Sequence, residues 1–297
     1  MLVTPHVTLK YINAAGRDMS FNYFYDFVIE KCIEEQPNNI YSVEQDGIDG
    51  EFFTGMRMGK RSIRLLGYVK NSGTSLHTVK QALGYVFNPT LSGVLHYSHA
   101  LMPRASKSIP CRLTELSEPV WDNKRGKLTF DILLTALDPY WRGNAHTEVI
   151  AKNQRKWRFP TRLPARPRGF VFDVRRSGLT SIFQNIGNVR TGFEATLRAV
   201  GGTVVNPEIY DVTSGKRLVL NLTMQPADVV HIINFPLLKR VFINSVNGFS
   251  TLNTRAENFG FFLINVGENH IGFRAEENVS NLQVSIRYTP QFTFAEG

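Results

Sequence analysis

Short stretches in which apolar and polar residues alternate run through most of this chain, and they constrain its fold more than any other feature. In the last third, Phe193, Ala195, Leu197 and Ala199 alternate with polar residues, and Leu218, Leu220 and Leu222 repeat the pattern. Such alternation is typical of strands with one buried face. Turn signals separate the stretches at about ten-residue spacing, and no helical period interrupts them, which is typical of a β-sandwich or jelly roll.

The N-terminal part alternates in the same way but contains one helical segment. Strands are predicted at residues 7–12, 61–69 and 127–132, with Leu128, Phe130 and Ile132 on one face of the last. Between them, residues 75 to about 87 carry apolar residues at helical spacing, with Ser75 or Thr74 as N-cap and an Asn-Pro pair at the end. These helix positions are Leu76, Val79, Leu83 and Val86. The sequence predicts a β-sandwich-like domain with one packed helix.

The length and the charge distribution predict two domains and a linker. A chain of 297 residues exceeds the usual size of one domain. Residues 152–176 contain nine basic side chains, one acidic side chain and three prolines. This segment therefore supplies +8 of the net charge of +9. We therefore expect domains at 1–146 and 170–297 and an extended basic linker at 147–169.

Three interpretations of the basic segment stay open at this point. It is a solvated linker, a strap that lies against an acidic surface of a neighbouring subunit, or a nucleic-acid contact in which Trp157 and Phe159 stack on bases. Nucleic acid is the least favoured, because no wider basic face supports it. If the segment is a strap, we expect its arginines to contact the neighbouring subunit. These are Arg155, Arg158, Arg162, Arg166 and Arg168.

The residues that carry catalysis or bind metals form no recognisable pattern. The two cysteines, Cys32 and Cys111, are too few for a disulfide framework, and His96 and His99 are the one close histidine pair. No metal, nucleophile or phosphate-loop motif is present. We expect no catalytic residue, metal or cofactor. No signal peptide and no membrane-spanning run is visible, so we expect a product that is made in the cytoplasm and contacts no membrane.

Five short motifs follow one another across nearly the whole chain. Each is a turn or domain-closing signal that is weak by itself: Gly47-Ile48-Asp49-Gly50 before the Arg-containing strand 61–65, Pro139-Tyr140-Trp141, Asn185-Ile186-Gly187, Asn206-Pro207, and Gly267-Glu268-Asn269. In this order they resemble the distal tail protein family of long-tailed bacteriophages that infect Gram-positive hosts.

The same motifs have direct structural interpretations. Gly50 closes a loop that projects from the N-terminal sheet, and Asn206 with Pro207 ends a strand. Gly267 with Asn269 forms a tight turn that needs a positive φ. Tyr140 and Trp141 either anchor the core or contact a neighbouring subunit. Separately, Asn247-Gly248 predicts a hairpin turn.

The resemblance implies a structural virion protein and not an enzyme. It implies a galectin-like C-terminal β-sandwich and a homohexameric ring at the virion tail tip. The partners implied are the tail tube, tape-measure, tail-associated lysin and receptor-binding or baseplate proteins. The main alternative is a β-sandwich adhesin that binds host cell-wall saccharide, with Tyr210, Trp157 and Phe249 as contributors; a tail-associated hydrolase is the least favoured reading.

Overall fold

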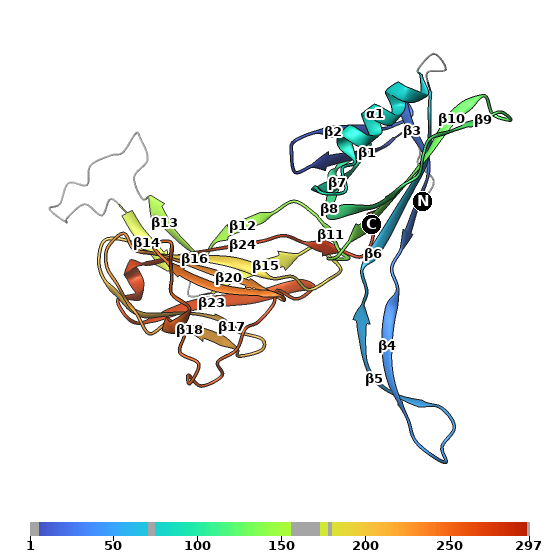
Figure 1. Ribbon diagram of the computed structural model, residues 1–297. Helices are drawn as coiled ribbons and strands as arrows, with labels where there is room; N and C mark the ends of the chain where they lie inside the picture. The colour runs from blue at the N-terminus through green and yellow to red at the C-terminus, as the bar shows by residue number, and fades with distance from the viewer. Residues whose placement is uncertain (1–5, 71–74, 156–172, 178–179, 296–297) are drawn as a thin grey trace. The chain divides into compact units, whose positions relative to one another are not determined.

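The computed structural model describes residues 6–70, 75–155, 173–177 and 180–295 (Figure 1). The chain divides into two compact units. The first comprises Met1–Gly143 together with Phe292–Gly297, and the second is Asn144–Gln291. The described residues are mostly in antiparallel strands with one α-helix, so the predicted mainly-β class is confirmed.

The strands of unit 1, apart from one separate hairpin, form a single ten-stranded sheet. Seven strands follow the order β2-β1-β7-β8-β10-β6-β3, and β9, β11 and β25 pair beside this path. Central β10 and β6 are in register over nine residue pairs, so the predicted face of β10 lies beside Val69, Gly67 and Leu65. The bounds are β1 Val7–Asn13, β2 Asp18–Phe21, β3 Phe27–Glu35, β6 Arg61–Val69, β7 Ser92–His99, β8 Met102–Leu116, β9 Val120–Asp122, β10 Lys127–Ala136, β11 Trp141–Arg142 and β25 Gln291–Phe292.

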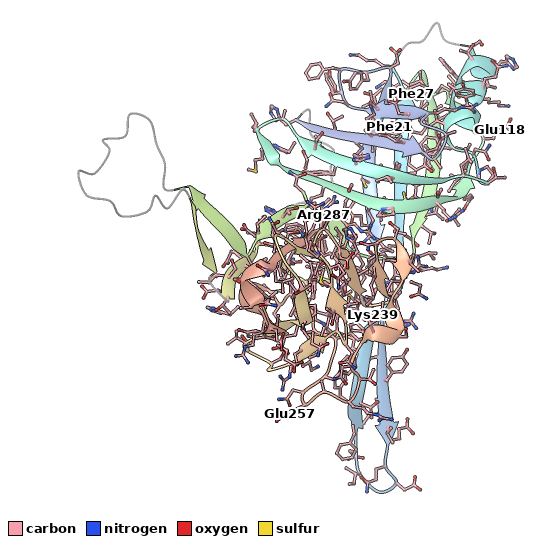
Figure 2. All side chains as sticks on the ribbon, turned by 90° about the vertical axis from the view of Figure 1, so that its left-hand side faces the viewer. Phe21, Phe27, Glu118, Lys239, Glu257 and Arg287 are labelled. Atoms are coloured by element: carbon pink, nitrogen blue, oxygen red, sulfur yellow. The ribbon has the colours of Figure 1, made fainter. Side chains whose placement is uncertain are left out.

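This single sheet curls around the hydrophobic core of unit 1. The Phe21 ring of β2 lies 6.5 Å from the Phe27 ring of β3, although these strands end opposite sides of the sheet order (Figure 2). Helix α1, Leu76–Val86, packs on the same core through Val79, Leu83 and Val86, and Ser75 caps it as predicted. Leu76, predicted on the buried stripe, is 44% exposed because it occupies the first helical position, beyond the core contact.

Unit 2 is a sandwich of two antiparallel sheets. The first has the order β12-β24-β16-β20-β21-β22, and the second β15-β23-β17-β18 with β19 beside β17. The predicted apolar positions of β16 are all buried between the sheets. The bounds are β12 His146–Val149, β15 Thr180–Asn185, β16 Phe193–Ala199, β17 Val204–Asp211, β18 Arg217–Val219, β19 Thr223–Met224, β20 Val229–Phe235, β21 Leu238–Ile243, β22 Val246–Asn247, β23 Gly267–Glu277 and β24 Leu282–Tyr288, with 3-10 turns η1 Phe249–Thr251 and η2 Val279–Asn281.

Part of the predicted linker belongs to unit 2. His146 pairs with Tyr288 as β12 joins β24, and β13 (Ala151–Arg155) pairs with β14 (Asp173–Ser177). The backbone of residues 146–155 is therefore engaged in ladders. No local pattern in residues 146–149 predicts this, because their partner strand β24 lies about 140 residues further along the chain. Arg155 lies on β13, whereas Arg158, Arg162, Arg166 and Arg168 lie outside the described residues, as do Trp157 and the three prolines.

Asn206 and Pro207 do not end a strand but lie inside β17. Asn206 has a φ of +47°, and its side-chain oxygen accepts the Leu222 N–H at 3.0 Å. At this kink β17 exchanges its partner β19 for β18, while Pro207 still pairs with Ala275 of β23. The side chain of Asn206 thus replaces a regular ladder bond, which lets the strand continue.

The predicted hairpin turn at Asn247-Gly248 lies at Asn244-Ser245 instead. These two residues have φ values of +47° and +72°, as a two-residue hairpin requires. The Asn244 side chain accepts the Val229 N–H at 2.9 Å and donates to Asp228 at 2.8 Å, which fixes the turn. Gly248 has another role, because a Cβ there would lie 2.7 Å from the Ile243 side chain.

The Gly267 turn is confirmed in its backbone, since Gly267 has a φ of +83°. Asn269 lies in β23 and is buried. Its side chain accepts the Asn265 N–H at 2.8 Å and donates to the carbonyls of Asn265 and Gly267, at 2.8 and 3.0 Å. Asn269 therefore closes the turn from the strand side.

Candidate functional site: a hairpin arm and its buried root

A two-stranded hairpin, the arm, extends from the sheet of unit 1 (Figure 1). It consists of β4 (Asn38–Glu44) and β5 (Glu51–Met58), and these strands pair only with each other among the described residues. The arm continues the β3–β6 pair beyond the edge of the sheet. Its tip is the predicted projecting loop, in which Gly47 and Gly50 have φ values of +82° and +98°.

Both faces of the arm expose large apolar side chains. Ile40 lies opposite Met56, and Val43 lies opposite Phe52. A register shift after Tyr41 places these two pairs on different faces. The exposed fractions are Ile40 65%, Tyr41 50%, Val43 55%, Phe52 55%, Phe53 69% and Met56 59%. An isolated two-stranded hairpin is marginally stable in water, and an exposed apolar surface of this kind marks an interaction site.

The tip of the arm is acidic. Residues 44–51 contain four carboxylates and no basic side chain, and all of them are exposed. The Ser42 hydroxyl of β4 donates to Glu51, the first residue of β5, which ties the two strands together near the tip. The arm therefore presents an apolar shaft and an anionic end.

A buried guanidinium fixes the root of the arm. Arg61 is 1% exposed. It donates to Glu34 at 2.5 Å, to Gln36 at 2.5 Å and to the carbonyl of Pro139 at 2.7 Å, and also to the carbonyl of Thr293. The same Glu34 oxygen accepts the indole N–H of Trp141 at 3.0 Å. A buried charge is tolerated because it is paired and hydrogen-bonded on several sides.

This network ties the arm to the rest of unit 1. Glu34 is the last but one residue of β3 and Arg61 is the first of β6, so the ion pair holds the two strands together where they leave the sheet. Just beyond, the Gly59 N–H donates to the Pro37 carbonyl at 2.8 Å, and a Cβ on Gly59 would lie 2.9 Å from that oxygen. Tyr140 adds a contact to Met58 Sδ at 2.8 Å. The root thus holds the direction of the arm.

Three of the predicted motifs lie on the arm or at its root. Gly50 lies at the arm tip, while Tyr140 and Trp141 lie at the root beside Arg61. Trp141 is 1% exposed, so its side chain anchors the core of unit 1. Asn206, Pro207, Gly267 and Asn269 lie in unit 2 and hold turns and a kink there.

Sequence reasoning missed the acceptors of Arg61 and the strands of the arm. Tyr41, Val43, Phe52 and Phe53 flank a Gly-containing turn, which is a hairpin signal that was available. Glu34 and Thr293 had no such signal, because they lie 27 and 232 residues from Arg61 along the chain.

Unit 2 offers a polar recess on the outer face of its six-stranded sheet. The recess has a volume of about 610 Å³ and is lined by Arg198, His231, Gln283 and their neighbours. His231 Nδ1 lies 3.1 Å from the Thr196 hydroxyl, and the described residues that line the recess include no carboxylate. Across the parts of the chain that the structure describes, no three His, Cys, Asp or Glu side chains cluster as metal ligands, and no helix is long and apolar enough to cross a membrane.

Comparison with known proteins shows what the chain is similar to. No curated protein sequence matches it. Its fold is similar to the crystal structure of SPP1 Dit, described as a paradigm of the hub adsorption apparatus in Gram-positive infecting phages, with a TM-score of 0.66, 12% identity, and coverage of 96% of this chain and 99% of that one. Chains of the phage P2 baseplate in its activated conformation, with Ca and with Sr, match at TM-scores of 0.46 and 0.45, both at 11% identity over 97% of this chain and 99% of theirs.

The family match lies in unit 2. Residues 186–292 match the model of the siphovirus-type tail component, C-terminal domain. This segment includes the Asn-Pro and Gly-x-Asn motifs on which the resemblance partly rested. Residues 186–292 therefore resemble a siphovirus-type tail component domain, and the predicted resemblance is confirmed by this family match and by the similarity in fold to SPP1 Dit.

Proposed function

We propose that this chain is the structural hub of a phage tail tip and that its arm closes a homohexameric ring. The observation that carries the proposal is the arm, which exposes apolar side chains on both faces and is held at a fixed root. Six copies that each place one arm on the next subunit make one repeated heterologous contact, and such a contact closes into a ring when the rotation fits.

The ring has two sets of partners in this proposal. On the tail side they are the tail tube protein and the tape-measure protein. On the host side they are the tail-associated lysin and the receptor-binding or baseplate proteins. Six-fold repetition multiplies modest contacts through avidity. The ring assembles in the host cytoplasm and ends at the virion tail tip. The basic residues 152–176 stay a predicted strap against an acidic surface of a neighbouring subunit.

The arm can be removed without cutting the fold, which gives a direct test. Replacing residues 38–58 by an Asn-Gly turn uses the short distance between Pro37 and Gly59, whose backbones share a hydrogen bond of 2.8 Å. We expect light scattering to show that the arm-less chain is a monomer. Circular dichroism should show that the rest of the β structure is retained. Leu237→Asp, at a fully exposed tip of unit 2, is the matched control and should leave assembly intact. A ring formed by the arm-less chain would overturn the proposal.

A second candidate function is saccharide binding by unit 2, and the polar recess favours it. Arg198, His231 and Gln283 offer hydrogen bonds there without a competing carboxylate. Two of the predicted contributors lie elsewhere: Tyr210 is on β17 beneath Arg274 at 4.7 Å, and Phe249 stacks on Phe261 at 6.5 Å. The third, Trp157, lies outside the described residues. A glycan array with the full chain tests this. Specific binding that Arg198→Ala removes would support an adhesin, and an array without binding would reject it.

A further inference from the structure

A second surface of unit 1 lies at the opposite end of β6 from the arm. The arm joins β6 at Arg61, whereas β9 pairs with the part of β10 that lies beside Val69. Nine strand residues at about 3.4 Å each separate these ends by roughly 30 Å. Figure 1 shows the arm and the β9–β10 hairpin pointing away from the sheet in different directions. A head-to-tail contact needs two such separate surfaces on one subunit.

The β9–β10 surface, defined here as residues 120–127, combines apolar and basic side chains. Val120 is 61% exposed and Trp121 is 47% exposed. The turn that follows carries three basic side chains and one carboxylate. That carboxylate, Asp122, is occupied by the turn itself, since it accepts the Lys124 N–H at 2.9 Å.

The basic side chains of this turn are not equivalent. Arg125 donates to Glu30 at 2.9 Å and also lies 3.6 Å from Asp122, so its charge is matched within its own subunit. Lys127 Nζ lies over the Tyr68 ring at 3.7 Å. Neither Lys124 nor Lys127 forms an ion pair with a carboxylate among the described residues. The surface therefore keeps an excess of positive charge beside an exposed tryptophan.

We propose that the β9–β10 surface of one subunit receives the arm tip of the next copy of this chain. The inference rests on the proposed ring and names the receiving surface. In this arrangement the four tip carboxylates face the two lysines that have no carboxylate partner among the described residues. Phe53, on the same face of the arm as Glu51, faces Val120, which lies on the same face of the β9–β10 hairpin as Lys127. Opposite charges select the partner and the register, while the apolar contact supplies the stability.

Charge exchange gives a test in which assembly is restored by mixing. The arm variant carries Glu44→Lys, Asp46→Lys and Asp49→Lys. The receiver variant carries Lys124→Glu and Lys127→Glu, and it keeps Arg125 because that side chain is paired internally. Each variant alone repels its own copy, so we expect the concentration needed for assembly to rise by at least about tenfold. A 1:1 mixture pairs each arm with a complementary receiver and should give rings in which the two variants alternate.

Cross-linking provides a second readout that does not depend on the charge variants folding. Both native thiols are buried, so Ile48→Cys with Asn123→Cys should join neighbouring subunits through a short bismaleimide. Ile48→Cys with Leu237→Cys is the matched control and should not. If the wild-type chain fails to assemble, the proposed function fails and this inference with it. If the wild type assembles while both charge variants also assemble alone and the Ile48–Asn123 pair does not cross-link, the ring stands and the receiving surface is wrong.

Discussion

At the scale of single residues, the Arg61–Glu34 pair is the least exposed ion pair in the described part of unit 1. Glu34→Ala leaves the buried guanidinium without its counter-charge and Trp141 without its acceptor. Breaking a buried pair in this way costs about 3–5 kcal/mol. Urea denaturation should show that loss in the free energy of unfolding of unit 1.

The Arg64–Asp131 pair is the control for this prediction. It lies on the same strand, but the Arg64 side chain is 49% exposed. Exposed ion pairs contribute about 0–1 kcal/mol, so Arg64→Ala should have a small effect. Equal losses for the two variants would mean that Arg61 is not a buried, paired charge.

Because the Tyr11 hydroxyl is buried, we expect the stability of unit 1 to fall in alkali. Burial raises the pKa of Tyr11 from 10.0 to about 12, and burial raises the pKa of the Cys111 thiol from 9.0 to about 12. The folded state thus keeps both protons at a pH where the unfolded chain has lost them. The stability that results is complete below pH 9 and is lost as the pH rises through 9 to 12.

Tyr11→Phe separates the contribution of that hydroxyl. Among the described residues the hydroxyl has no hydrogen-bond partner, and the ring stacks on Phe87 at 4.6 Å. The variant keeps the stacking and removes an unsatisfied polar group, so it should be at least as stable at pH 7. Its unfolding midpoint should also fall less steeply between pH 9 and 11. A steeper fall would contradict the assignment.

At the scale of elements, the C-terminal residues complete unit 1. The chain crosses between the units twice, and Phe292 returns to pair β25 with β11. Lys107 donates to the Phe294 carbonyl at 3.1 Å and lies over the Phe292 ring at 4.1 Å. Ala295 is buried in the core. The tail therefore supplies acceptors to two buried cations, Lys107 and Arg61.

Removing Phe292–Gly297 should destabilise unit 1 selectively. Hydrogen bonds to charged groups contribute about 1.5–3 kcal/mol each, so the two lost acceptors should cost about 3 kcal/mol or more. Calorimetry should show a lower transition for unit 1 and an unchanged one for unit 2. Phe294→Ala is the control, since its side chain is 63% exposed and its carbonyl remains. A uniform shift of both transitions would contradict this prediction.

Elements that follow from residue spacing within one short segment were predictable from the sequence. Elements that depend on hydrogen bonds to residues elsewhere in the chain were not. The strand faces of β6, β10 and β16 and helix α1 follow from spacing alone. The kink at Asn206 depends on a bond to Leu222, and the true hairpin turn depends on the bonds of Asn244 to Asp228 and Val229. The root of the arm depends on contacts across most of the chain, which no local pattern encodes.

At the scale of the whole molecule, the arm gives the chain a contact that it cannot satisfy alone. Its shaft is apolar on both faces and its tip is anionic, while its root is fixed by buried polar groups. An element whose root is already held loses less conformational freedom when it docks, which favours association. In the proposed ring, one repeated contact between identical subunits covers every arm at once.

Native mass spectrometry of the full-length chain over a range of concentrations tests this claim most directly. The account predicts a species of six times 33.6 kDa that becomes dominant as the concentration rises. A monomer at every concentration, also in the presence of the tail tube and tape-measure proteins, would contradict it.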